Sequence, residues 1–136
     1  MSPPIEMRTL SEDECLDLLR SQPVGRLVFT ENALPAVRPV NFLLDGTDVI
    51  IRTAPDSWSH RLAGSVVAFE ADHIDPDTHT GWSVVVLGTA AVVTDIDSLV
   101  RISDPHHRPW APGRRDRYLR VTAGEITGRR LSLAPA

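Results

Sequence analysis

The chain has 136 residues, of which 42% are apolar, and a formal net charge of −4, which fits one folded domain and disfavours bulk nucleic-acid binding. Its single cysteine, Cys15, excludes an internal disulfide, and no lysine-rich patch or membrane-length apolar run is present. We therefore expect a cytoplasmic protein without a signal peptide, built as a single domain over residues 1–136 and binding neither nucleic acid nor membranes.

The first predicted element is a helix that begins after Ser11. Residues 1–8 are polar and contain two prolines, so we expect them to form a loose lead-in. Ser11 is a favourable N-cap, and Glu14 three residues later completes a capping box. Leu10 and Cys15 stand where a hydrophobic staple would lie across this cap. We expect Cys15 to be a small buried hydrophobe rather than a nucleophile.

Three strands are predicted next, over residues 25–30, 36–44 and 49–53, joined by a turn at Asn32 and by the hairpin signal Asp45-Gly46. The middle strand contains Arg38 and Pro39. A proline cannot donate to a sheet ladder, so it predicts an edge or a bulge where neighbouring backbone groups lack strand partners. Arg38 beside that gap could donate to a phosphate or a carboxylate. The alternative is a solvated arginine on an edge strand.

A short helix is predicted through residues 60–63, capped by Ser57 or Ser59 and ended by Gly64. It follows the strand end Arg52-Thr53. Free N–H groups, a hydroxyl and guanidinium groups converging there would form an anion site. An ordinary surface turn with solvated charges is the alternative.

A fourth strand is predicted over residues 66–70, followed by a polar loop over residues 72–80. The loop contains residue types that ligate metals, namely Asp72, His73, Asp75, Asp77 and His79. No helical or strand register fixes their spacing, so we expect no metal site and interpret Asp72 and Asp75 as turn formers.

The remaining predicted elements are a valine-rich strand from residue 81 to about residue 94, a short helix and two further strands. Trp82 at the head of the valine-rich strand could cap the core or form the wall of a site for a flat ligand. Asp95 is the expected cap of a helix over residues 96–102. A loop over residues 103–117 holds His106 and His107, and strands are expected over residues 118–122 and 125–133. The sum is a mainly β barrel of six or seven strands with two or three short helices.

In the order and spacing of these segments, the chain resembles the pyridoxamine 5′-phosphate oxidase-like, flavin-binding split-barrel superfamily, in an uncharacterised bacterial branch. The resemblance covers roughly residues 11–131. The segments that carry it are VGRL at 24–27, RPVNF at 38–42, IRT at 51–53, VAFEAD at 67–72 and GWSVVVLG at 81–88.

This resemblance implies a split β-barrel that forms a homodimer with FMN at the subunit interface. The strand at 38–41 would lie along the isoalloxazine ring, the segments at 52–53 and 59–61 would bind the ribityl phosphate, and the strand start at 82–83 would face the flavin across the dimer. The implied cofactor-binding residues are Arg38, Pro39, Val40, Asn41, Arg52, Thr53, Ser59, His60, Arg61, Trp82 and Ser83.

Two departures from the family pattern matter for function. The basic pair that grips the phosphate is usually arginine and lysine, whereas here histidine comes first, at His60. The authentic oxidases end in a substrate-binding segment rich in arginine and histidine, which the segment GRRLSL at 128–133 does not match. The resemblance therefore does not extend to vitamin B6 oxidation.

The function implied by the resemblance is an FMN-dependent oxidoreductase of a small molecule, in which the flavin carries the hydride or electron chemistry and no side chain is assigned as catalytic. An F420-dependent reductase of the same fold is an alternative, with a basic groove supplied by Arg108, Arg114, Arg115 and Arg117. A non-catalytic flavin or haem carrier and an empty barrel that serves as a dimerisation module are further alternatives. His106 and His107 could face the substrate or lie in a solvated loop.

Overall fold

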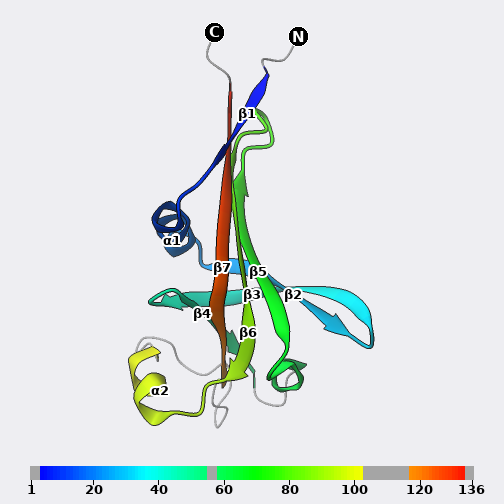
Figure 1. The fold of residues 1–136 in the computed structure, drawn as a ribbon, viewed down its shortest axis with the longest axis vertical. Coiled ribbons are helices and arrows are strands. Elements are labelled where there is room, and N and C mark those ends of the chain that lie inside the picture. The colour runs from blue at the N-terminus through cyan, green and yellow to red at the C-terminus, as the bar shows by residue number, and fades with distance from the viewer. Residues whose placement is uncertain (1–3, 55–57, 103–116, 134–136) are drawn as a thin grey trace.

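The computed structural model describes residues 4–54, 58–102 and 117–133, which form an antiparallel seven-stranded sheet with two α-helices and a short 3-10 helix (Figure 1). The strands are β1 (Ile5–Thr9), β2 (Val24–Glu31), β3 (Leu34–Asp45), β4 (Asp48–Thr53), β5 (Val66–Ile74), β6 (Gly81–Val92) and β7 (Arg117–Leu133). The helices are α1 (Glu12–Arg20), η1 (Trp58–Leu62) and α2 (Ile96–Ile102). Six strands close into a ring in the order β7-β4-β3-β2-β5-β6, because β6 also pairs with β7, and β1 pairs with β7 outside that ring. The predicted mainly β barrel is confirmed.

The long strand β7 joins the parts of the barrel. Residues 117–121 pair with β4, residues 129–133 pair with β1, and β6 lies along most of the strand. Leu87 faces Glu125 whereas Gly88 faces Ala123, so Gly124 is the extra residue of a β-bulge. The prediction of two separate strands was wrong, because the break in the pattern marks a bulge within one strand.

The N-terminal segment is also more ordered than we expected. Residues 5–9 form β1, with Ile5 opposite Leu133, where a loose lead-in was predicted. All five residues of β1 are exposed, so the segment lacks the alternation by which a strand is identified from sequence. Its pairing with the end of β7 makes it a strand.

Helix α1 begins as predicted. Ser11 Oγ accepts a hydrogen bond from the Glu14 backbone N–H at 3.2 Å, and Glu14 Oε1 accepts one from the Ser11 N–H at 3.1 Å. Leu10 and Cys15 are both buried and lie against Gly128 of β7. Burial raises the pKa of the Cys15 thiol, as is typical of a small buried hydrophobe.

The barrel interior is filled by apolar side chains from all six strands of the ring and from α1. The largest fully buried members of this core include Phe69, Leu19, Leu27, Ile51, Leu119 and Val84. Burial of this kind is the main stabilising contribution in a small β domain.

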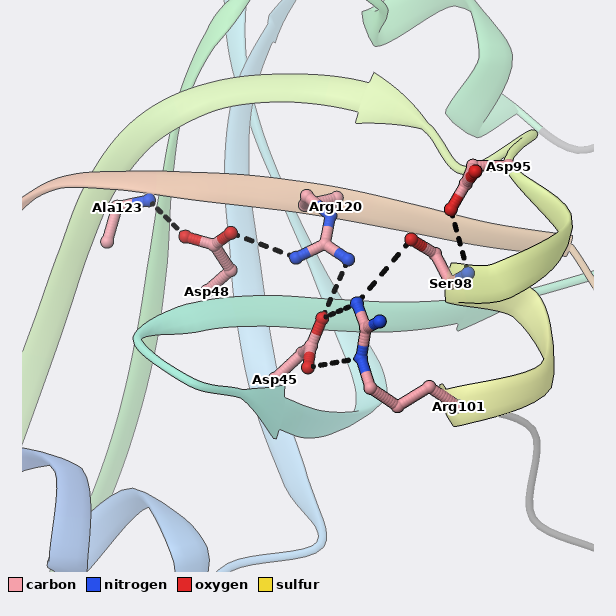
Figure 2. Close-up of polar contacts among 7 residues, drawn as sticks. All are labelled: Asp45, Asp48, Asp95, Ser98, Arg101, Arg120 and Ala123. Atoms are coloured by element: carbon pink, nitrogen blue, oxygen red, sulfur yellow. Dashed lines mark hydrogen bonds and ion pairs between the residues drawn. The ribbon is translucent and has the colours of Figure 1, made fainter.

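Helix α2 packs beside the β3–β4 hairpin, where Ile102 contacts the cluster of Ile50 and Tyr118 (Figure 2). Asp95 caps it as predicted, accepting from the Ser98 N–H at 2.8 Å. Arg101 of α2 donates to both carboxylate oxygens of Asp45, at 3.0 and 2.8 Å. Arg120 of β7 donates to Asp45 and to Asp48, at 2.8 and 2.9 Å. Hydrogen bonds from Arg101 and Arg120 lower the pKa of Asp45 to about 2, so the carboxylate stays ionised.

The β2–β3 hairpin extends from the barrel and ends in a two-residue turn, at the right in Figure 1. Asn32 and Ala33 have φ values of 52° and 62°, the backbone conformation that such turns need. Residues 34–40 of β3 pair with β2 alone, because pairing with β4 begins at Asn41. Within the described chain these residues form a free strand edge, and the prediction that Pro39 lies at an edge is confirmed.

None of the helices in the described part of the chain combines the length and the apolar character that a membrane crossing requires.

Candidate functional site

The centre of the candidate site is an aromatic platform that holds Arg38. The rings of Phe29 on β2 and Trp58 on η1 stack with centroids 5.1 Å apart and an angle of 2° between their planes. The Arg38 guanidinium carbon lies 5.8 Å from the Phe29 centroid and 5.2 Å from the Trp58 centroid, within cation–π range. The Nε atom of Arg38 is buried and has no hydrogen-bond partner among the described residues. Arg38 is therefore held in place while its buried Nε–H donor has no partner among the described residues.

A second arginine joins Arg38 through a shared carboxylate. Arg38 Nη2 donates to Glu31 Oε2 at 3.4 Å, and Arg61 Nη2 donates to Glu31 Oε1 at 3.0 Å. Arg38 belongs to β3, Glu31 to β2 and Arg61 to η1. Beside them lies a cavity of about 220 Å³, with Phe29, Glu31, Trp58 and Arg61 among its lining residues. Two cations from separate elements thus converge on one carboxylate, and Glu31 and Arg61 line the cavity.

Two buried hydroxyls connect this cluster to the end of β4. Ser59 Oγ donates to Thr53 Oγ1 at 3.1 Å, and Thr53 Oγ1 donates to the Arg117 carbonyl at 3.2 Å. This chain of hydrogen bonds fixes η1 against β4 and β7, and so positions Trp58 and Arg61. The structure therefore brings Thr53 and Ser59 together, and in the described chain their hydrogen bonds hold η1, which carries Trp58 and Arg61, to the end of β4.

Asn41 and Arg52 lie in a different, smaller pocket. They face each other across β3 and β4 and line a cavity of about 60 Å³ together with Ile102 of α2 and Tyr118 of β7. Helix α2 therefore forms one wall of this smaller pocket.

The other predicted site residues are spread more widely. Pro39 is exposed on the free edge of β3, Val40 is buried in the core and His60 is exposed on η1. Trp82 is 6% exposed within the hydrophobic core, and Ser83 pairs with Asp72 and Arg129. In sheet order β6 is separated from β3 by β2 and β5, so one chain does not bring Trp82 and Ser83 to Arg38.

The predicted loop over residues 72–80 starts later than expected. Strand β5 continues to Ile74, so Asp72 is a strand residue and its interpretation as a turn former was wrong. Asp75 does form the turn, since its carboxylate accepts from the N–H groups of Asp77 and Thr78 at 2.8 and 3.3 Å. Across residues 4–54, 58–102 and 117–133, no group of three His, Cys, Asp or Glu side chains could hold a metal ion.

Several predicted residues lie outside the described part of the chain. They are Ser57, His106, His107, Arg108, Arg114 and Arg115. Arg117, the remaining member of the predicted basic groove, is the exposed first residue of β7.

The sequence interpretation missed Glu31, Phe29 and Trp58. Glu31 was taken only as a turn residue, although the two-residue turn makes it the last residue of β2 and places it on the same face of the strand as Phe29. In that register Arg38 faces Leu27 and is a diagonal neighbour of Phe29, so the hairpin signal could have identified this pair. The position of Trp58 depends on how η1 packs, which no local pattern encodes.

The outer face of the barrel carries a second charged cluster. Arg26 Nη1 on β2 donates to Glu70 at 2.8 Å and to Asp72 at 3.2 Å, both on β5. Burial and the neighbouring Asp72 raise the pKa of Glu70 to about 7, although Arg26 opposes the shift. The cluster lies beside a row of apolar cross-strand neighbours, Val37, Val28, Ala68 and Leu87.

Comparisons with known proteins agree with this architecture. The chain is 43% identical over 132 residues to the uncharacterized protein Rv0080 of Mycobacterium tuberculosis, covering 93% of this chain and 86% of that protein. The solved structure of the FAD binding protein from Mycobacterium smegmatis matches with a TM-score of 0.81 and 35% identity, covering 93% of this chain and all of the other. A conserved protein of unknown function from Corynebacterium diphtheriae matches with a TM-score of 0.77 and 33% identity, covering 93% and 98%. The family model for pyridoxamine 5′-phosphate oxidase matches residues 11–130, and the chain belongs to this family.

Proposed function

We propose that the chain binds a flavin nucleotide, FMN or FAD, and uses it as an oxidoreductase of a small molecule. The observation that carries the proposal is the pair of arginines, Arg38 and Arg61, that converge on one carboxylate beside the free edge of β3. The two guanidinium groups would hold the phosphate next to the ribityl chain. Backbone groups of residues 38–40 that have no strand partner on the β4 side would hydrogen-bond the polar edge of the ring.

The residues present fit such a ligand. The unpartnered Nε of Arg38 offers a donor beyond the two already engaged with Glu31. The family relative from Mycobacterium smegmatis is an FAD binding protein, which supports a flavin here. When bound, a flavin supplies hydride or electron transfer. The role of the protein would be to bind the phosphate, to orient the flavin ring and to shape the space above the ring.

We further propose that the active form is a homodimer with the cofactor at the subunit interface. The apolar row on the outer face supports this, because it runs across four strands and includes Val37 and Leu87, which are 59% and 40% exposed. A second copy would also bring its own Ser83, which lies on the same face of β6 as Leu87, toward the site, whereas Trp82 is buried within its own barrel. Leu87→Lys should give a monomer in size-exclusion chromatography with light scattering. Val100→Lys, on the exposed face of α2, should leave the mass unchanged. Equal masses for both variants would show that the apolar row is not the dimer interface.

Titration of the purified protein with FMN, FAD and F420, followed by flavin or deazaflavin fluorescence, tests the cofactor. We expect flavin binding that Arg61→Ala weakens about tenfold or more, which is the loss expected for one charge-assisted contact to phosphate. The matched control is Arg20→Ala on α1, an arginine whose side chain is similarly exposed. Equal affinities of both variants would contradict the phosphate assignment.

The same experiment separates the alternatives. Tight binding of F420 without flavin binding would favour the deazaflavin reductase, and a Soret band in the isolated protein would favour a haem carrier. Oxidation of a reduced nicotinamide by the flavin-loaded protein would distinguish an enzyme from a carrier. Binding of none of these cofactors would leave a dimerisation module.

A further inference from the structure

Glu31 occupies the position where two arginines converge. Each of its carboxylate oxygens is taken by a different guanidinium, Oε2 by Arg38 and Oε1 by Arg61. Its side chain is 31% exposed, so one side of the bridge faces solvent. A carboxylate that holds two cations in this way is a chemical equivalent of a phosphate held by the same two groups.

The bridge between Glu31 and the two arginines leaves one buried hydrogen-bond donor of Arg38 without a partner among the described residues. Both oxygens of Glu31 are engaged, yet the Nε atom of Arg38 is buried without a partner among the described residues. An unpaired buried donor of a charged group is unfavourable. A phosphate monoester has three terminal oxygens, one more than a carboxylate, and could satisfy the donors that Glu31 satisfies and one further donor.

Glu31 also lies at a position from which its side chain can move away from the two arginines. It is the last residue of β2 and precedes the turn residues Asn32 and Ala33. Strand β5 pairs with β2 only at residues 26–28, so the end of the hairpin that carries Glu31 is paired on one side only within the described chain. A rotation of the Glu31 side chain toward solvent would free both arginines without disrupting the barrel.

We propose that Glu31 is an internal occupant of the phosphate subsite, which the phosphate of a flavin nucleotide must displace. Glu31 then sets how strongly the chain distinguishes phosphorylated from unphosphorylated flavin. This inference rests on the proposed function and adds a residue that opposes binding. The rival interpretation is that Glu31 serves only to hold η1 to the β2–β3 hairpin, with no ligand involved.

The test compares Glu31→Gln with the unchanged protein in titrations with FMN and with riboflavin, which lacks the phosphate. Glutamine keeps the shape of the side chain but removes the charge that competes for the arginines. We expect the dissociation constant for FMN to fall about tenfold and that for riboflavin to change less than twofold. Asp17→Asn, which removes one acidic charge from an ion pair on α1, should change neither constant.

Each other result decides against the inference. An unchanged or weakened affinity for FMN in the folded variant would show that Glu31 does not compete with the phosphate. An equal gain for riboflavin would show that Glu31 acts on the ring or on the access to the site. A variant that does not fold by circular dichroism would show that the bridge is a structural requirement. If the unchanged protein binds neither FMN nor riboflavin, the proposed function itself fails.

Discussion

Phe29 and Trp58 stack almost parallel, with their centroids 5.1 Å apart, although they come from a strand and from a separate 3-10 helix. The stack joins η1 to the β2–β3 hairpin and carries Arg38 at its side. The geometry of the candidate phosphate site therefore depends on an aromatic contact as well as on charge.

Replacing Trp58 with alanine should destabilise the protein by about 2 kcal/mol, because both the stacking and the cation–π contact are lost. Trp58→Phe keeps a ring above Phe29 and should therefore lose much less stability. Urea unfolding of both variants gives the comparison. Equal losses in the two variants would contradict the stacking, because phenylalanine keeps both a ring and most of the buried apolar area.

Gly128 is required by the packing of α1 on β7. A Cβ at this position would lie 2.5 Å from Cys15 Sγ and 3.1 Å from Leu10 Cδ1, so Gly128→Ala should cost about 1–3 kcal/mol by overpacking. Gly124 is the matched control, because a Cβ there would meet only the Leu87 carbonyl oxygen at 3.5 Å. Thermal unfolding should show a clear loss for Gly128→Ala and little change for Gly124→Ala. Adding Cys15→Ala to Gly128→Ala should recover part of the loss, and a further loss would contradict this packing.

Glu70 should make stability depend on pH. Its pKa rises from the ordinary value of 4.5 to about 7 in the folded protein, chiefly through burial and through Asp72. Between these two pH values the folded state binds more protons than the unfolded state, so the free energy of unfolding should decrease as pH rises. We expect a decrease on the order of 1 kcal/mol, since solvent screens these partly exposed charges. Glu70→Gln should flatten the profile measured by urea unfolding, and identical profiles would contradict the role of Glu70.

The two arginines that bind Asp45 should contribute unequally to the stability of the protein. The Arg120 side chain is 20% exposed and bridges two aspartates, whereas the Arg101 side chain is 55% exposed. Arg120→Ala leaves the half-buried carboxylates of Asp45 and Asp48 without this partner and should cost about 2 kcal/mol. Arg101→Ala should cost less, although hydrogen exchange in α2 should become faster. A larger loss of stability for Arg101→Ala would contradict this ranking.

The elements with strong local signals could be predicted from the sequence. The capping box at Ser11, the Asp45-Gly46 hairpin and the cap at Asp95 depend on short-range chemistry and were correct. Strand β1 and the continuity of β7 were missed, because both depend on pairing between distant segments. Asp72 was misassigned for the same reason, since its strand continues as a partner of β6.

In the candidate site, too, some features are encoded locally and others depend on contacts between distant segments. The proline at the free edge and Arg38 beside it could be inferred from residue types alone, whereas the convergence of Arg38 and Arg61 could not. The bridging role of Glu31 could not be inferred from the sequence, because it depends on the relative positions of β2, β3 and η1. These three elements are joined by the closed sheet and the aromatic stack. Trp82 could have been a core residue or a ligand wall by sequence, and within one chain it lies in the core.

A crystal structure of the protein with FMN tests the central proposal most directly. We predict that the phosphate oxygens lie within hydrogen-bonding distance of Arg38 and Arg61, with Glu31 turned away and the ring along residues 38–41. A flavin bound elsewhere, with Glu31 still joining the two arginines, would contradict the account.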